Sequence, residues 1–325
     1  MVEYATDTEL TFLHFVAIFI HLISGILGTL VALSNNPHVS VYSSLVSFVN
    51  RTDDGSYLIK NPTKVFTIAT LSPNIAVEFI TCFFHILYVL QLHWSTFDDF
   101  VKRFVSTNSK NALRWVEYGI TATIMMAFGN IAVGISDFYF FLKIVTNGFA
   151  LQAIGYCIEL LTYDKRDKNA IDNRLFKILY NFIGLNLNIV NVVILLYHVF
   201  SSDTGSSYKY YIENSAPFGL WFQTFGIVCY LSFYRYRQFA CINFTEKWYI
   251  LLSLSTKVAT FWLSFGTFRR ILEDQNVIPP IQGVNWNSVR YCAMTIPAII
   301  VIIYAVVDWY KWRIVYMKIG RRCRL

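Results

Sequence analysis

Lys257 is the residue whose position in this sequence most restricts its chemistry. It stands in the middle of a long apolar stretch, residues 248–268, where a charged side chain costs at least about 2.5 to 3.5 kcal/mol if the stretch crosses a bilayer. Two interpretations are open: the ammonium pairs with a buried carboxylate, or the amine forms a Schiff base with an aldehyde. Ser253 lies one helical turn before Lys257, and Phe261 and Trp262 lie one turn after it. A small polar group beside an aromatic wall is typical of a site for a conjugated ligand, which favours the Schiff base.

A protonated Schiff base needs a negative charge at a similar depth. Glu117, near the start of the apolar stretch 115–135, is the candidate, and Arg114 precedes it by one turn. Glu117 is therefore interpreted either as the counterion of the Schiff base or as the partner of Arg114 in a salt bridge at the membrane interface.

Two further pairs of ionisable residues repeat with a helical spacing. His14 and His21 are seven residues apart in the first apolar stretch, and Glu78 and His85 have the same spacing in the second. Residues seven apart share a helix face, about 10 Å from each other along the axis. The carboxylate and imidazole of Glu78 and His85 are interpreted either as a water-bridged proton relay or as a static hydrogen-bonded pair.

Other ionisable and sulfur-bearing residues carry weaker signals. Glu159 and Glu213 lie near the ends of apolar stretches and could load or release protons, although solvation at the membrane interface is the favoured interpretation. The six cysteines show no spacing with each other or with histidines that is typical of a metal site. We therefore expect no bound metal.

The composition predicts the elements that position these side chains. The 325 residues are 55% hydrophobic and only 14% charged, whereas soluble domains carry roughly a quarter charged residues. A membrane-spanning helix needs about 20 mostly apolar residues, and the chain has eight such stretches. The fold class is therefore all-α, a polytopic helical membrane protein, with spans at residues 10–33, 65–92, 115–135, 138–161, 175–199, 215–234, 248–268 and 289–307.

The distribution of basic residues predicts the orientation. With the N-terminus in the cytoplasm, most of the 27 lysine and arginine residues fall in inner loops and in the C-terminal tail. Eight spans then place both termini in the cytoplasm, and the net charge of +7 lies mostly on an inner face next to anionic lipid. The outer loop 34–64 alternates in places and contains Asp53-Asp54-Gly55, which predicts a β-hairpin. Its Asn50-Arg51-Thr52 is a glycosylation sequon that we expect to be silent.

Three motifs together resemble heliorhodopsins, which are retinal proteins with an inverted orientation. They are Arg114-Trp-Val-Glu117-Tyr118, Gly134-Ile-Ser-Asp137 and Ser253-Leu-Ser-Thr-Lys257. The resemblance covers roughly residues 10 to 270, and the branch from large algal viruses is the most similar. It implies a cytoplasmic N-terminus, which the basic residues indicate independently.

The resemblance also implies roles for individual residues. Lys257 is expected to hold all-trans-retinal as a Schiff base, with Glu117 as its counterion. Further retinal contacts are expected from Ser253, Tyr118, Phe261 and Trp262, and a proton pathway or polar cavity from His21, His85, Glu78, His14, Glu159 and Arg114. A homodimer in the plasma membrane is expected on the same basis.

The chain departs from the family after its seventh predicted span. Residues 1–270 are predicted to form a seven-helix retinal-binding bundle. Residues 271–325 are predicted to add an outer loop, the extra span 289–307, which contains Pro297, and a basic cytoplasmic tail. The extra span could pack on the bundle, alter a dimer interface or bind another protein.

Three functions compete at this stage. The leading one is a retinal protein that conducts or transports protons under light, since some members of the viral branch do so. The alternative is a light sensor that signals through a partner protein. A ligand-gated receptor of the G-protein-coupled type is disfavoured because the sequence lacks Asp-Arg-Tyr and Asn-Pro-x-x-Tyr at the expected positions. No cluster of residues predicts an enzyme, and no motif predicts nucleic-acid binding.

Overall fold

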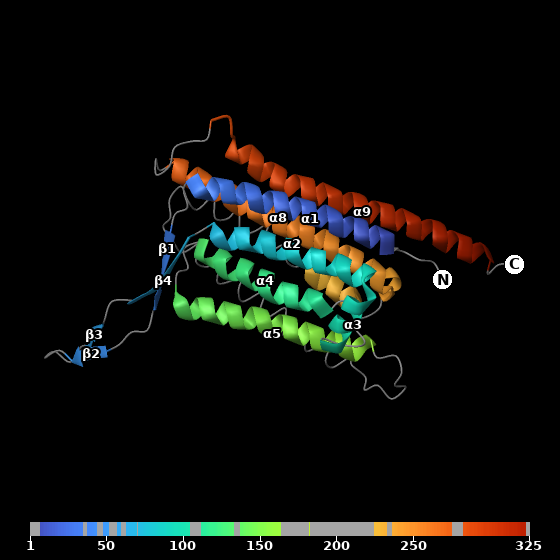
Figure 1. Cartoon of the computed structure of the whole chain (residues 1–325), viewed down its shortest axis with the longest axis horizontal. Coiled ribbons are helices and arrows are strands. Elements are labelled where there is room, and N and C mark those ends of the chain that lie inside the picture. Colours follow the sequence, from blue (N-terminus) through green and yellow to red (C-terminus); the bar gives the residue numbers. More distant parts are fainter. Residues whose placement is uncertain are drawn as a thin grey trace.

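A computed structural model describes residues 7–34, 38–43, 48–51, 57–59, 63–69, 71–104, 112–132, 137–163, 182, 224–232, 236–274 and 282–322. Most of the described chain is helical. The long helices run side by side, and both chain termini lie at one end of the bundle, which is called the terminal end below (Figure 1). The strands lie at the opposite end, which is called the sheet end.

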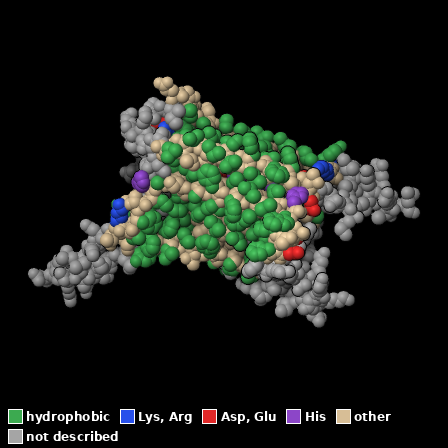
Figure 2. Space-filling view, viewed as in Figure 1, with side chains coloured by type: hydrophobic (Ala, Val, Ile, Leu, Met, Phe, Trp, Pro, Cys, Tyr) green, Lys and Arg blue, Asp and Glu red, His purple; other side chains and the backbone are tan. Residues whose placement is uncertain are grey.

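The described helices form where the sequence is apolar over many turns. Four of them are long and apolar enough to cross a membrane. Figure 2 shows hydrophobic side chains over the middle of one face and charged or histidine side chains towards its two ends. The helices are α1 (Asp7–Ser34), α2 (Ser72–His93), α3 (Ser95–Phe104), α4 (Ala112–Ala132), α5 (Phe138–Tyr163), α8 (Ile242–Asp274) and α9 (Trp286–Arg322), with a short 3₁₀ helix, η1 (Arg237–Ala240), before α8.

Six of the eight predicted spans coincide with described helices, namely α1, α2, α4, α5, α8 and α9, except at some of their limits. The predicted span 65–92 is wrong at its start, because residues 63–69 form a strand and α2 begins only at Ser72. Pro73 stands in the first turn of α2, where a missing backbone N–H is tolerated. α8 begins six residues before the predicted span at Trp248, and α9 extends past Val307 to Arg322. The predicted span 175–199 lies outside the described residues apart from residue 182, and so does much of 215–234.

Two antiparallel strand pairs follow α1. β1 (His38–Ser43) pairs with β4 (Thr63–Ala69), and β2 (Phe48–Arg51) pairs with β3 (Tyr57–Ile59). The segment with strands therefore extends five residues beyond the predicted loop 34–64. β4 holds β-branched and aromatic residues, which favour strands and also raise hydropathy, so its sequence resembles the start of a span.

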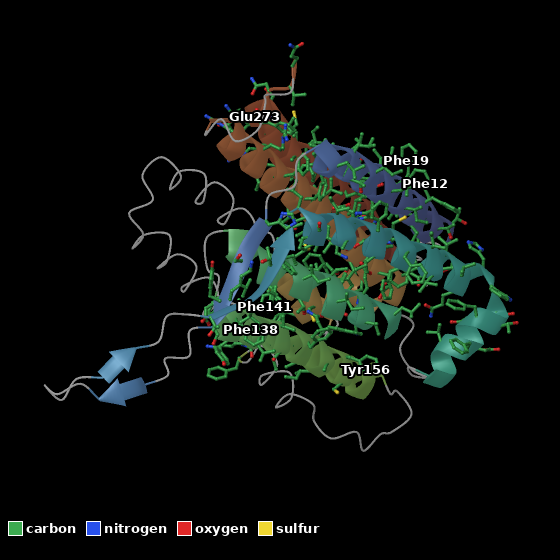
Figure 3. All side chains as sticks on the ribbon, turned by 60° about the vertical axis from the view of Figure 1, so that its left-hand side comes forward. Phe12, Phe19, Phe138, Phe141, Tyr156 and Glu273 are labelled. Atoms are coloured by element: carbon green, nitrogen blue, oxygen red, sulfur yellow. The ribbon has the colours of Figure 1, made fainter. Side chains whose placement is uncertain are left out.

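The strands cover the start of α5 at the sheet end. The ring of Phe66 on β4 meets the rings of Phe138 and Phe141 edge to face, with centroids 6.3 and 5.8 Å away, and Figure 3 shows Phe138 and Phe141 beside the strands. Phe12 and Phe19 on α1 point away from the bundle in the same view and are 62% and 65% exposed. Exposed apolar side chains agree with α1 being one of the helices that are apolar enough to span a membrane.

α8 is the central helix for the site, because it packs against α1, α2 and α9. Leu71, Phe261, Phe265 and Trp286 form a buried cluster at the sheet end. α9 approaches α8 closely at Gly266, where an added Cβ would lie 2.8 Å from Cγ of Arg290. α2 in turn packs against α1 and α4, so side chains from α2, α4 and α8 can meet in the interior.

Candidate functional site

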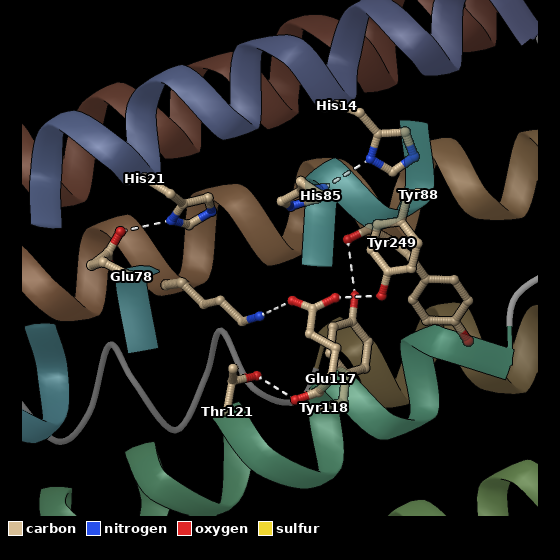
Figure 4. A network of polar contacts seen from close by, with 10 residues as sticks. His14, His21, Glu78, His85, Tyr88, Glu117, Tyr118, Thr121 and Tyr249 are labelled. Carbon is tan, nitrogen blue, oxygen red and sulfur yellow. Dashed lines mark hydrogen bonds and ion pairs between the residues drawn. The ribbon is translucent and has the colours of Figure 1, made fainter. Parts of the chain in front are cut away.

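Lys257 and Glu117 form a buried ion pair between α8 and α4. Their side chains are 4% and 2% exposed, and Nζ of Lys257 donates to Oε1 of Glu117. Tyr88 of α2 donates its hydroxyl to the other carboxylate oxygen, Oε2, at 2.6 Å (Figure 4). Nζ also lies 5.2 Å from the ring centroid of Tyr118. The carboxylate of Glu117 therefore joins three helices at the depth of the lysine.

Arg114 pairs with a carboxylate that the sequence did not single out. It donates to Oε1 of Glu246 on α8, and both side chains are buried. Its guanidinium also lies over the ring of Tyr249, 4.0 Å from the centroid. Across the helices, Arg114 therefore pairs with Glu246, and Glu117 pairs with Lys257.

The residues that flank Lys257 on α8 are held by their own contacts. Ser253, one turn before the lysine, is 1% exposed. Phe261, one turn after it, is 2% exposed and stacks on Phe265 with ring centroids 5.7 Å apart. Trp262 donates its indole N–H to Oγ of Ser24 on α1 at 3.1 Å. The aromatic side of the site is therefore fixed by packing and by a hydrogen bond to another helix.

The four ionisable residues with seven-residue spacing pair across helices rather than along them. Nδ1 of His21 lies 2.6 Å from Oε2 of Glu78, and Nδ1 of His14 lies 2.8 Å from Nδ1 of His85. The rings of His21 and His85 stack with centroids 5.8 Å apart. All four side chains are at most 3% exposed. α1 and α2 thus bury a continuous polar line between them, which is here called the histidine line.

Tyr88 connects the histidine line to the lysine. Its ring lies 5.1 Å from the ring of His14 and 5.6 Å from that of His85, while its hydroxyl bonds to Glu117. Polar contacts and ring contacts therefore run without a break from Glu78 to Lys257.

Several atoms of the histidine line have unused hydrogen-bonding capacity. Nε2 of His21, Oε1 of Glu78, Oγ1 of Thr81 and Nε2 of His85 are buried and have no hydrogen-bond partner among the described residues. Buried polar atoms of this kind are usually satisfied by internal water. In the described part of the chain, no group of three or more His, Cys, Asp or Glu side chains is placed to hold a metal ion.

The structure adds residues to those that sequence reasoning proposed. Tyr88 follows His85 by three residues, so a search of the same helix face would have found it. Glu246 and Lys247 were missed as interior residues because the span was expected to begin at Trp248, whereas α8 begins at Ile242. The side chain of Glu159 and the whole of Glu213 lie outside the described residues.

Comparison with known families covers most of the chain. Residues 10–268 match the family model described as Heliorhodopsin. A search of curated proteins finds no match. The matched stretch contains most of α1, all of α2, α3, α4 and α5, and the part of α8 that bears Lys257, and it ends before α9 begins. With the match extending over far more than half of its residues, this chain belongs to the heliorhodopsin family, the rhodopsin-type integral membrane proteins.

Proposed function

We propose that this rhodopsin binds all-trans-retinal as a Schiff base on Lys257 and moves protons across the membrane under light. The observation that carries the proposal is the burial of Lys257 against Glu117, with Tyr88 on the second carboxylate oxygen. Nζ of Lys257 would hold the aldehyde through a C=N bond, with loss of water, and the carboxylate of Glu117 would balance the positive charge of the protonated nitrogen.

The residues around Lys257 fit this chromophore. A long conjugated aldehyde needs a buried amine, one carboxylate at its positive end and aromatic side chains along its length. Lys257 and Glu117 supply the first two. Tyr118, which directly follows Glu117, and Phe261, one turn after Lys257, supply buried aromatic rings. The chromophore contributes absorption of visible light and a change of shape about a double bond.

The histidine line supplies groups that can hold and pass a proton. Oε1 of Glu117 can accept a proton from Nζ of Lys257, since these two atoms already share a hydrogen bond. Tyr88 touches both Glu117 and the ring of His14, and the pair of His21 and Glu78 ends the line on the side towards the sheet. Imidazole and carboxylate groups change protonation near physiological pH when their surroundings change, which is what a proton path requires.

The ends of the bundle agree with the proposed orientation, in which both termini are cytoplasmic. Both termini lie at one end in Figure 1, with the strands at the other. In this orientation His93 and Thr11, whose side chains lie 2.9 Å apart, stand near the cytoplasmic end of α2 and α1. A proton that leaves the histidine line on this side would meet these exposed polar groups before water.

The experiment is a whole-cell photocurrent recording under voltage clamp, with retinal supplied and Lys257→Ala as the control. A light-evoked current that follows the proton gradient and is absent from the control supports the proposal. A visible absorption band that the control loses, without any current, refutes proton movement and assigns the protein to light sensing through a partner. If no visible band forms with retinal, retinal binding itself is refuted.

A further inference from the structure

α9 lies outside the residues that match the family, yet it is joined to the bundle at both ends. At the sheet end, the guanidinium of Arg269 on α8 lies 5.8 Å from the ring centroid of Trp286 on α9. Trp286 also donates its indole N–H to Oε1 of Glu273 on α8 at 2.9 Å. At the terminal end, Nζ of Lys247 on α8 donates to Oδ1 of Asp308 on α9 at 2.6 Å.

The pair of Lys247 and Asp308 is buried. Lys247 is fully buried and Asp308 is 5% exposed, and Oε1 of Glu9 on α1 lies 3.4 Å from the same ammonium. A buried lysine without a carboxylate partner is strongly destabilising, so this contact restrains the position of Lys247. Apolar side chains close the space around it, with Leu10, Leu13, Ile250 and Leu251 forming a cluster against which Tyr304 of α9 packs. Three helices are thus fixed to one another at Lys247.

The residue before Lys247 connects the same turn of α8 to the retinal site. Successive residues on a helix point about 100° apart, so Glu246 faces α4 while Lys247 faces α1 and α9. Glu246 pairs with Arg114, and Glu117 follows Arg114 by one turn of α4. Val301 of α9 also packs against the buried cluster that contains Tyr118.

We propose that Asp308 is a positioning residue for the light-absorbing site. By holding Lys247, it fixes the first turns of α8, which keeps Glu246 on Arg114 and thereby sets the place of Glu117 relative to Lys257. This inference rests on the proposed function for its optical consequence, but its structural consequence exists without retinal. α9 then helps to position the side chains of the light-absorbing site.

The test compares three variants of the full chain. Asp308→Asn removes the negative charge at this position, and Asp308→Glu keeps it. Lys311→Gln removes an exposed positive charge one turn away and is the matched control. In the retinal-free protein, amide hydrogen exchange of residues 112–121 is expected to rise by about threefold or more in Asp308→Asn, with little change in the other two. After retinal is added, the absorption maximum of Asp308→Asn is expected to shift, and that of Asp308→Glu to return towards the original.

A fourth variant tests the route through Lys247. In a Lys247→Met background, Asp308→Asn is expected to add no further change in exchange at residues 112–121, because the contact that transmits the effect is already absent. The inference is overturned if Asp308→Asn changes exchange only within α9, if Lys311→Gln has an equal effect, or if the two substitutions act additively. If the unchanged protein forms no visible band with retinal, the proposed function fails, while the exchange measurement still decides the role of Asp308.

Discussion

The buried pair of Lys257 and Glu117 makes a quantitative prediction about the retinal-free protein. Both side chains are almost fully buried, so a substitution of one partner leaves the other without its counter-charge. Glu117→Gln and Lys257→Met are each expected to lower the free energy of unfolding by about 3 to 5 kcal/mol. The double variant replaces both charges by neutral groups of similar size and is expected to lie close to the unchanged protein. The coupling energy, which is the change in the double variant minus the sum of the changes in the single variants, is then about 6 to 10 kcal/mol in magnitude.

The assay is a double-mutant cycle on the unfolding of the retinal-free protein in detergent micelles, followed by loss of helical circular dichroism. The control cycle uses Thr11→Ala and His93→Ala, which remove an exposed contact of 2.9 Å and are expected to couple by less than about 1.5 kcal/mol. The reasoning is refuted if the two buried substitutions add to within about 0.5 kcal/mol. Additivity would mean that the ammonium and carboxylate do not depend on each other.

Three further predictions concern the neighbours of this pair. Glu78→Gln is expected to abolish the photocurrent and leave the colour largely intact, and an unchanged current would exclude a role for this carboxylate. Tyr88→Phe removes the hydrogen bond to the carboxylate of Glu117, so it is expected to destabilise the protein by about 1.5 to 3 kcal/mol and to shift the absorption band. An absorption maximum and an unfolding free energy equal to those of the unchanged protein would contradict this. Gly28→Ala would place a Cβ 2.4 Å from Cζ of the buried Phe261 and is expected to lower the free energy of unfolding by about 1 to 3 kcal/mol. In the control variant Gly119→Ala, the nearest atom to the added Cβ is 3.4 Å away, so this substitution should be tolerated. Equal melting temperatures for the two variants would refute the steric argument.

The sequence predicts the helices well because an apolar run of about 20 residues has few other stable forms in a membrane. The error at β4 has a physical reason. Residues 63–69 are rich in β-branched and aromatic side chains, and these favour a strand once β1 is available to accept the backbone hydrogen bonds. Hydropathy measures neither that propensity nor the presence of a partner strand.

The partners of the ionisable residues were harder to predict than their positions. A spacing of seven residues places His21 on one face of α1, but only the packing of α1 against α2 brings it to Glu78. Arg114 and Glu246 likewise come from helices far apart in the chain. Helical periodicity identifies which face is polar, whereas the choice of partner depends on the rotation and height of each helix in the bundle.

Glu117 is the point at which two buried polar systems of the bundle meet. Through Tyr88 it contacts the histidine line between α1 and α2, and one turn along α4 it follows Arg114, which leads through Glu246 to the contacts of α9. A change of charge at Glu117 therefore alters the electrostatic environment of both systems, because charges separated by low-dielectric interior are poorly screened. The histidine line consists of groups that exchange protons, whereas the system on the side of α9 consists of ion pairs between helices. If this protein shows no photocurrent, we expect the effect of light absorption to reach the rest of the molecule through a movement of α8 against α9. If it shows a photocurrent, we expect protons to move along the histidine line.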